Sequence, residues 1–260
     1  MIYFFGVILG LLPSFIWLLF YLRQDRHPEP NRMVIKIFIW GMLIGPLAAV
    51  GELAIKFLLN PMPLAEFFSG SGEKEWIMFA SVVFAAPLVE EYLKYRVVKD
   101  KVLKNPEMDE PLDIMLYMII AALGFAAVEN LLLIVEKPIL PMGQALKHAL
   151  SISGSRFLSA TVLHALSSGI LGYWLARSLR EPQKKLNYLA KGFWLAIFFH
   201  AGYNYFSWLI EQGQEKNIIL AIAAILLLFA VMAIMVLKGF SLLKKFHSVC
   251  RICPAPTKIK

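Results

Sequence analysis

Charged residues are scarce in this chain of 260 residues, and cysteine is nearly absent. Asp, Glu, Lys and Arg make up 17% of the sequence and hydrophobic residues 59%, with a mean hydropathy of +0.65. This is the composition of an integral membrane protein rather than of a soluble domain. The sequence also lacks an internal repeat, a low-complexity tract and a His-Glu-x-x-His run, and the last absence excludes the familiar zincin geometry.

The only two cysteines, Cys250 and Cys253, stand in a tail near the end of the chain. We place this tail in the cytosol, where thiols stay reduced, and predict no disulfide bond. A single Cys-Arg-Ile-Cys run supplies half of a zinc site, and no second pair of ligands stands near it. We therefore favour an ordinary tail over a metal site.

Long apolar runs occupy most of the remaining sequence. Residues 2–22 and 218–237 carry no charge, and each run has about the ~20 residues that a helix needs to cross the hydrocarbon core of a bilayer. We expect the first run to be a retained helix rather than a signal peptide. Five further runs complete an all-α polytopic transmembrane bundle of about seven spans: about 33–59, 76–98, 112–135, 157–176 and 189–210.

Lysine and arginine alternate between the connections that join these spans. Eighteen of the 26 basic residues lie in four segments, 23–32, 96–111, 177–191 and 238–260, and the other three connections hold five. Basic residues collect in cytoplasmic loops, so we predict that the N-terminus is outside and the C-terminus cytosolic. This topology explains the net charge of +8, and we expect the lipid bilayer, not nucleic acid, as a partner.

The connection from residue 137 to residue 156 is too polar to span a membrane. Ala145, Leu146, Ala149 and Leu150 nevertheless recur at helical spacing within it. This pattern suits a short helix that lies at the outer interface.

Three ionisable residues fall within five positions of the third predicted span: Glu90, Glu91 and Lys94. An ionisable side chain near the bilayer centre costs roughly 2.5 to 3.5 kcal/mol on insertion scales, which indicates a functional role for the group. Positions four apart share a helix face, so we expect Glu90 beside Lys94 and Glu91 turned toward a neighbouring helix. Such a difference in surroundings would divide the carboxylates into an acid and a base, the alternative being a self-neutralising charge pair.

Further polar residues lie in three other spans. His200 and Asn204 are four apart and can present donors to a developing oxyanion, with interhelical hydrogen bonding as the alternative. His164 stands among small residues that can line a cavity, and Glu129 with Asn130 follows another small-residue stretch. The convergence of these residues on four consecutive helices favours a catalytic site, although Glu129 and His164 are expected nearer the outer surface than Glu90.

Two mechanisms could use these residues. In the first, which we favour and which needs no cofactor, Glu90 and Glu91 supply base and acid, His164 assists proton transfer, and His200 with Asn204 stabilises the oxyanion. Lys94, Glu129 and Asn130 support the site. In the second, a zinc ion is bound by Glu91, His164 and His200, and the other glutamate acts on the metal-bound water.

The ordered set of motifs resembles the PrsW family of bacterial intramembrane proteases, which is distantly related to the type II CAAX prenyl endopeptidases. The resemblance covers most of the chain. It is carried by Pro28-Glu29-Pro30, Glu90-Glu91-x-x-Lys94, Phe125-x-x-x-Glu129-Asn130, His164 after Arg156, and His200-x-x-x-Asn204.

The resemblance implies an endopeptidase of the bacterial inner membrane that cuts a membrane-anchored protein. Its substrate would be a single-span protein, and in the best-known members this is an anti-sigma factor of an envelope-stress response. Residues 1–240 would then form a transmembrane protease domain and residues 241–260 a short basic cytosolic tail. A proton-coupled transporter and a non-catalytic membrane scaffold are the alternative functions, because intramembrane Glu, Lys and His also serve as proton relays or as helix-packing contacts.

Overall fold

The structure of the protein is a computed structural model that describes residues 2–25, 27–61, 74–135, 141–213 and 215–245. The regular secondary structure in these ranges is entirely helical, which confirms the predicted all-α class. Both cysteines, in residues 246–260, lie outside the described residues, and so does most of the predicted tail. The division of the chain at residue 240 therefore stays a prediction.

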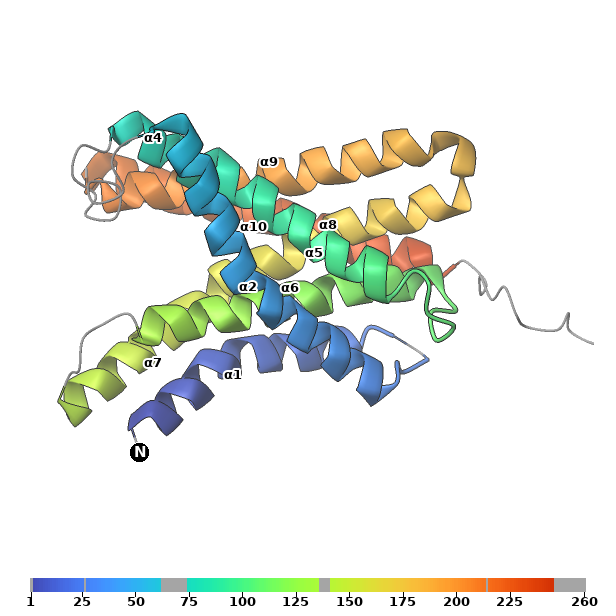
Figure 1. Cartoon of the computed structure of the whole chain (residues 1–260), viewed down its shortest axis with the longest axis horizontal. Helices are drawn as coiled ribbons and strands as arrows, with labels where there is room; N and C mark the ends of the chain where they lie inside the picture. The colour runs from blue at the N-terminus through green and yellow to red at the C-terminus, as the bar shows by residue number, and fades with distance from the viewer. Residues whose placement is uncertain (1, 26, 62–73, 136–140, 214, 246–260) are drawn as a thin grey trace, which may run out of the picture.

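Long helices that run alongside or across one another form the bundle (Figure 1). A π-helical turn joins α4 to α5, and a 3₁₀ turn joins α8 to α9. In chain order the elements are α1 (Ile2–Leu22), α2 (Asn31–Leu59), α4 (Glu75–Ala80), the π turn (Ser81–Ala85), α5 (Ala86–Lys101), α6 (Pro111–Val135), α7 (Met142–Leu158), α8 (Ala160–Arg180), the 3₁₀ turn (Pro182–Lys184), α9 (Lys185–Glu211) and α10 (Glu215–Leu243).

Six helical segments of the described chain are long and apolar enough to cross a membrane, so the protein is a multi-pass membrane protein. They are α1, α2, α4 with α5, α6, α7 with α8, and α10. The span predicted at 189–210 is not among them, although it lies in α9, a helix of 27 residues beside α8 (Figure 1). Lys191, His200 and Asn204 lower the hydropathy of α9, and the predicted count of about seven is therefore approximate.

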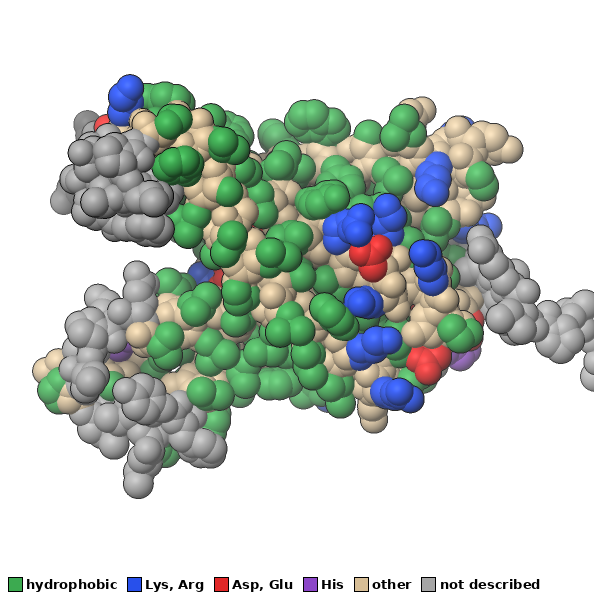
Figure 2. Space-filling model, viewed as in Figure 1, with side chains coloured by type: hydrophobic (Ala, Val, Ile, Leu, Met, Phe, Trp, Pro, Cys, Tyr) green, Lys and Arg blue, Asp and Glu red, His purple; other side chains and the backbone are tan. Residues whose placement is uncertain are grey.

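The basic connections lie together at one end of the bundle. The α1–α2, α5–α6 and α8–α9 connections share this end, and the N-terminus lies at the opposite end (Figure 1). His27 and Glu110 join two of these connections, with 2.7 Å between Nδ1 and Oε1. Lys and Arg side chains gather over the same end (Figure 2). This arrangement agrees with the predicted topology, in which the basic end faces the cytosol.

The connection between α1 and α2 is anchored to α6 through Glu29. The Tyr117 hydroxyl donates a hydrogen bond to its carboxylate at 2.5 Å. Burial raises the pKa of the Glu29 carboxyl above its usual range. Asp113, in the first turn of α6, accepts hydrogen bonds from the backbone N–H groups of Asp109 and Glu110 at 3.0 and 2.7 Å, which satisfies donors at the start of this helix.

The helix α6 lies at the centre of the bundle. All its residues from Pro111 to Ala127 are buried, and they are covered by α1, α2, α5 and α8. A helix that is apolar on every side is typical of such an enclosed position. The helix predicted between residues 137 and 156 is present as α7, which packs along α1 and α6.

Two glycines allow α2 and α6 to cross with their backbones in contact. A Cβ atom added at Gly41 would lie 2.1 Å from the carbonyl oxygen of Ala121, and one added at Gly124 would lie 2.1 Å from that of Phe38. Close approach of this kind through small residues is the usual way in which membrane helices pack. The crossing holds α2, and with it one wall of the site, against the central helix.

We predict that Gly124→Ala lowers the free energy of unfolding by about 1–3 kcal/mol, because the new methyl group must push two backbones apart. The measurement is unfolding of the purified protein in mixed detergent micelles. Gly154→Ala is the matched control, because nothing lies within 4 Å of a Cβ atom at that exposed position in α7. Equal stability of the two variants would contradict the proposed backbone contact.

Candidate active site

A π-helical turn, Ser81–Ala85, interrupts the helix that carries the acidic pair. We attribute it to Pro87, which has no N–H to donate and is poorly tolerated inside a regular helix. In the π register residue 87 would donate to the carbonyl of Val82, so this oxygen needs another partner. Asn204 of α9 supplies one: its side-chain N–H donates to the Val82 oxygen at 2.8 Å. The turn thereby ties α9 to the start of α5.

Glu90, Glu91 and Lys94 of α5 are buried, and both carboxylates pair with Lys94. The Lys94 Nζ donates to Glu90 Oε2 at 3.2 Å and to Glu91 Oε1 at 2.9 Å. The Glu91 carboxylate also accepts hydrogen bonds from the hydroxyls of Ser167 and Ser168 on α8, at 3.0 and 2.8 Å. These partners offset the cost of taking the charges out of water.

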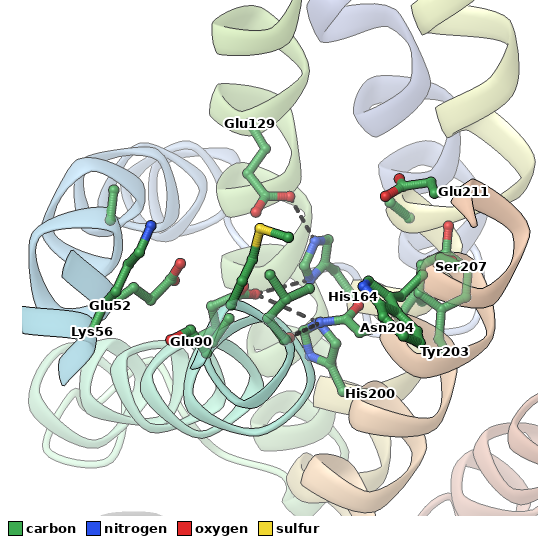
Figure 3. A pocket seen from close by; sticks show the side chains of 18 of the residues that line it. Glu52, Lys56, Glu90, Glu129, His164, His200, Tyr203, Asn204, Ser207 and Glu211 are labelled. Atoms are coloured by element: carbon green, nitrogen blue, oxygen red, sulfur yellow. Dashed lines mark hydrogen bonds and ion pairs between the residues drawn. The ribbon is translucent and has the colours of Figure 1, made fainter. Parts of the chain in front are cut away.

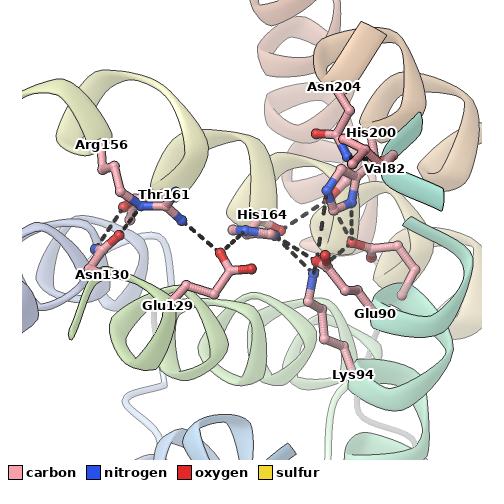
Figure 4. Close-up of polar contacts among 12 residues, drawn as sticks. Val82, Glu90, Lys94, Glu129, Asn130, Arg156, Thr161, His164, His200 and Asn204 are labelled. Carbon is pink, nitrogen blue, oxygen red and sulfur yellow. Dashed lines mark hydrogen bonds and ion pairs between the residues drawn. The ribbon is translucent and has the colours of Figure 1, made fainter. Parts of the chain in front are cut away.

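Two imidazoles face this group from α8 and α9 (Figure 4). The Nδ1 atom of His164 lies 2.9 Å from Lys94 Nζ and 3.5 Å from Glu90 Oε2. The Nδ1 atom of His200 lies 3.1 Å from Glu91 Oε1, and its Nε2 atom lies 3.8 Å from Glu90 Oε2. The two rings meet edge to face, with 5.1 Å between their centroids. Three helices therefore bring their polar side chains to one point.

A second polar chain holds His164 from its other side. Its Nε2 atom lies 2.8 Å from Glu129 Oε2, and Arg156 donates to the same oxygen at 2.6 Å. Arg156 also donates to Asn130, whose amide donates to Thr161 at 3.3 Å. In the sequence, Arg156 contributes to the family resemblance, and no role in the site is predicted for it. Its only other signal was a basic residue in a connection otherwise poor in basic residues.

A cavity of about 630 Å³ opens beside these groups (Figure 3). Carboxylates and imidazoles form its inner wall, and the last turns of α2 and α9 form its outer part. Figure 2 shows the hollow at the end of the molecule opposite the basic end. The lining includes Glu52, Lys56, Ser81, Glu90, Glu129, Arg156, His164, His200, Tyr203, Asn204, Ser207, Trp208 and Glu211. A space this large and polar can hold water.

The structure brings all the predicted site residues to this region but gives them different access to the cavity. Four of the five residues predicted as catalytic line the cavity: Glu90, His164, His200 and Asn204. Glu91 lies behind the wall with no exposed surface, and so does Lys94. Of the other supporting residues, Glu129 lines the cavity and Asn130 is buried beside Arg156. The catalytic roles of these residues stay predictions.

The expected difference in depth between Glu90 and His164 is removed by an interruption of the helix between α7 and α8. The helix α7 ends at Leu158 and α8 begins at Ala160, which is buried. Because α8 starts inside the bundle, its first turns reach the level of the acidic pair. His164 can therefore contact both Lys94 and Glu129.

Glu90, His164 and His200 each offer one atom to a group that could hold a metal ion, since these atoms lie within 4.8 Å of one another. One carboxylate and two imidazoles are a common ligand set for catalytic zinc. The group contains Glu90, whereas the sequence predicts Glu91 as the third ligand. The lone pair of His164 Nδ1, however, is taken by Lys94. As arranged, these residues do not fit a bound metal ion, and the mechanism below uses none.

A helical membrane bundle with a polar cavity lined by carboxylates and imidazoles fits the class of intramembrane hydrolases. Residues 29–237 match a sequence model described as "PrsW family intramembrane metalloprotease". The chain belongs to this family, so it is an intramembrane protease with a protein substrate in the membrane, and the resemblance found in its motifs is confirmed.

Several similar proteins carry the name "Protease PrsW". The one from Geobacillus kaustophilus (strain HTA426) is 27% identical over 75% of this chain and 75% of its own length. The one from Clostridioides difficile (strain 630) is 25% identical over 86% and 87%, and the one from Bacillus subtilis (strain 168) is 26% identical over 72% and 74%. No solved structure matches the chain.

The hydrogen bonds predict the tautomers of the two site histidines. His164 should carry its proton on Nε2, facing Glu129, and His200 should carry one on Nδ1, facing Glu91. Nitrogen chemical shifts of protein labelled with ¹⁵N-histidine in lipid nanodiscs measure this directly, with single His→Gln variants to assign the signals. A His164 protonated on Nδ1 alone would contradict the described contacts with Lys94 and Glu129.

Proposed function

We propose that this protein is an endopeptidase of a bacterial inner membrane that hydrolyses a peptide bond of a single-span membrane protein, with a glutamate as general base. The observation that carries the proposal is the position of Glu90. Its carboxylate faces the cavity and lies 3.5 Å from His164 Nδ1 and 3.8 Å from His200 Nε2. Family membership favours this function over the carrier and the scaffold that the same polar residues could serve.

The two glutamates take different parts in the proposed reaction. Glu90 can reach water in the cavity, and it accepts a proton as that water attacks the carbonyl carbon of the substrate. The proton then passes to the amine nitrogen as the C–N bond breaks. His164 lies beside Glu90 and supports the transfer through Lys94, which contacts both side chains. Glu91 lies behind the cavity wall and acts as a positioning residue that holds Lys94 and His200.

His200 and Asn204 supply the proposed oxyanion site. His200 contacts Glu91 through Nδ1, so Nε2 is the nitrogen that faces the cavity. It donates a hydrogen bond to the oxyanion when both nitrogens carry protons. The Asn204 amide has two N–H groups, and its contact with Val82 uses one of them. The second is available to a substrate oxygen in the cavity.

The shape of the cavity supports access from the outer side of the membrane. Its mouth is formed by Lys56 near the end of α2 and by Ser207 and Glu211 near the end of α9. Both ends lie opposite the basic connections, which face the cytosol. A substrate would therefore present its scissile bond from the outer half of the bilayer. An anti-sigma factor anchored by one helix fits this class of substrate.

We predict that Glu90→Gln lowers the cleavage rate by about 10²-fold or more, because an amide cannot accept the proton from water. The assay uses purified protease and a single-span reporter in the same proteoliposomes, with product measured on gels. Glu75→Gln, an exposed change at the start of α4, is the matched control and should cleave normally. A Glu90→Gln protein that keeps more than about a tenth of the wild-type rate would reject Glu90 as the base.

If the cavity opens on the outer side of the membrane, cysteines introduced at the cavity and at the basic end should be labelled from opposite sides. In a chain whose Cys250 and Cys253 are replaced by serine, Ser207→Cys should react with a membrane-impermeant maleimide added to intact spheroplasts. Lys184→Cys, in the 3₁₀ turn at the basic end, should react only after the membrane is opened. The reverse pattern would place the mouth of the cavity on the cytosolic side.

A further inference from the structure

A lysine ammonium stands at the centre of the site, among atoms that a metal ion would bind (Figure 4). The Lys94 side chain has no exposed surface, and its Nζ lies 4.4 Å from the centroid of the Phe125 ring. Its three N–H groups have three acceptors, Glu90 Oε2, Glu91 Oε1 and His164 Nδ1, at 3.2, 2.9 and 2.9 Å. Every donor of the ammonium is therefore used within the protein.

The surrounding groups nevertheless lie close to the spacing of a zinc site. Zinc bonds of roughly 2.0–2.2 Å in tetrahedral geometry place the ligand atoms about 3.3–3.6 Å apart. Glu90 Oε2 lies 3.5 Å from His164 Nδ1 and 3.8 Å from His200 Nε2. The other nitrogen of each imidazole contacts a carboxylate, Glu129 for His164 and Glu91 for His200, as is usual for metal-bound histidines. The ligand set is therefore suitable in composition and close to a zinc site in spacing.

Lys94 makes this ligand set unusable for zinc. His164 donates from Nε2 to Glu129, so its single lone pair is on Nδ1, and Lys94 holds that lone pair. A divalent ion bound to Glu90 would also lie close to the ammonium. Like charges repel strongly where water is excluded. Both the hydrogen bond and the charge therefore oppose metal binding.

We propose that Lys94 is the resident cation of the site. It neutralises the glutamate pair, holds the lone pair of His164, and so excludes zinc from ligands that would otherwise bind it. Lys94 is thereby a positioning residue that keeps Glu90 available as a base. This inference rests on the proposed metal-independent peptidase function.

The test is to remove the ammonium and measure metal binding. Lys94→Leu keeps an apolar contact with Phe125 and leaves Glu90, His164 and His200 without the competing cation. Wild type and variant are purified in nanodiscs and titrated with Co²⁺, whose visible absorption reports tetrahedral coordination. We expect the variant to bind Co²⁺ at least about tenfold more tightly than wild type. The double variant Lys94→Leu/His164→Ala should lose the gained affinity, which would locate the ion on the proposed ligands.

Lys101→Leu is the matched control, because Lys101 lies at the end of α5 over the Trp40 ring, away from the site. It should bind Co²⁺ no more tightly than wild type. Equal Co²⁺ affinity of wild type and a folded Lys94→Leu protein would overturn the proposal.

Zinc content of the wild-type protein gives a second measurement that does not depend on the folding of a variant. Protein purified from zinc-supplemented cells should carry far less than one zinc per chain by mass spectrometry, and one tightly held zinc per chain would overturn the role of Lys94. Cleavage of the reporter is measured on the same samples. If the wild-type protein does not cleave the reporter, the proposed peptidase function is rejected. The metal measurements would still decide the role of Lys94.

Discussion

The burial of two carboxylates and an ammonium between lipid-facing helices is the constraint on which the rest of the structure depends. Each charged atom must find its partner within the protein, because the hydrocarbon around the bundle offers none. Glu91 meets this demand through Lys94, His200 and two serine hydroxyls. These partners come from α5, α8 and α9, so the charges also fix how the three helices are placed against one another.

Small residues make that convergence sterically feasible. The crossing of α2 and α6 at Gly41 and Gly124 brings two backbones into contact, and buried Ser167, Ser168 and Gly169 allow α8 to lie close to its neighbours. The helix is interrupted between α7 and α8, and α8 then places His164 in the interior of the bundle. Close packing and an interrupted helix together bring polar groups from different helices to one point.

The site has a dry side and a side that faces the cavity, and the acidic pair is divided between them. Glu91 and Lys94 are enclosed, whereas Glu90 shares the cavity wall with both imidazoles. A general base needs contact with water, and a buried ion pair needs protection from it. Adjacent positions on one helix satisfy both needs, because side chains one residue apart point in directions about 100° apart.

Several features could be derived from the sequence because they are local. Apolar runs of membrane length, the alternation of basic connections and the intramembrane polar residues each depend on short stretches of chain, and together they determined the all-α class, the topology and the family. Only the tertiary structure decided that Glu90 rather than Glu91 faces the cavity, that Arg156 holds Glu129, and that Lys94 occupies the lone pair of His164. These depend on how helices rotate, tilt and break against one another, which follows from packing across the whole bundle and not from residue spacing within one helix.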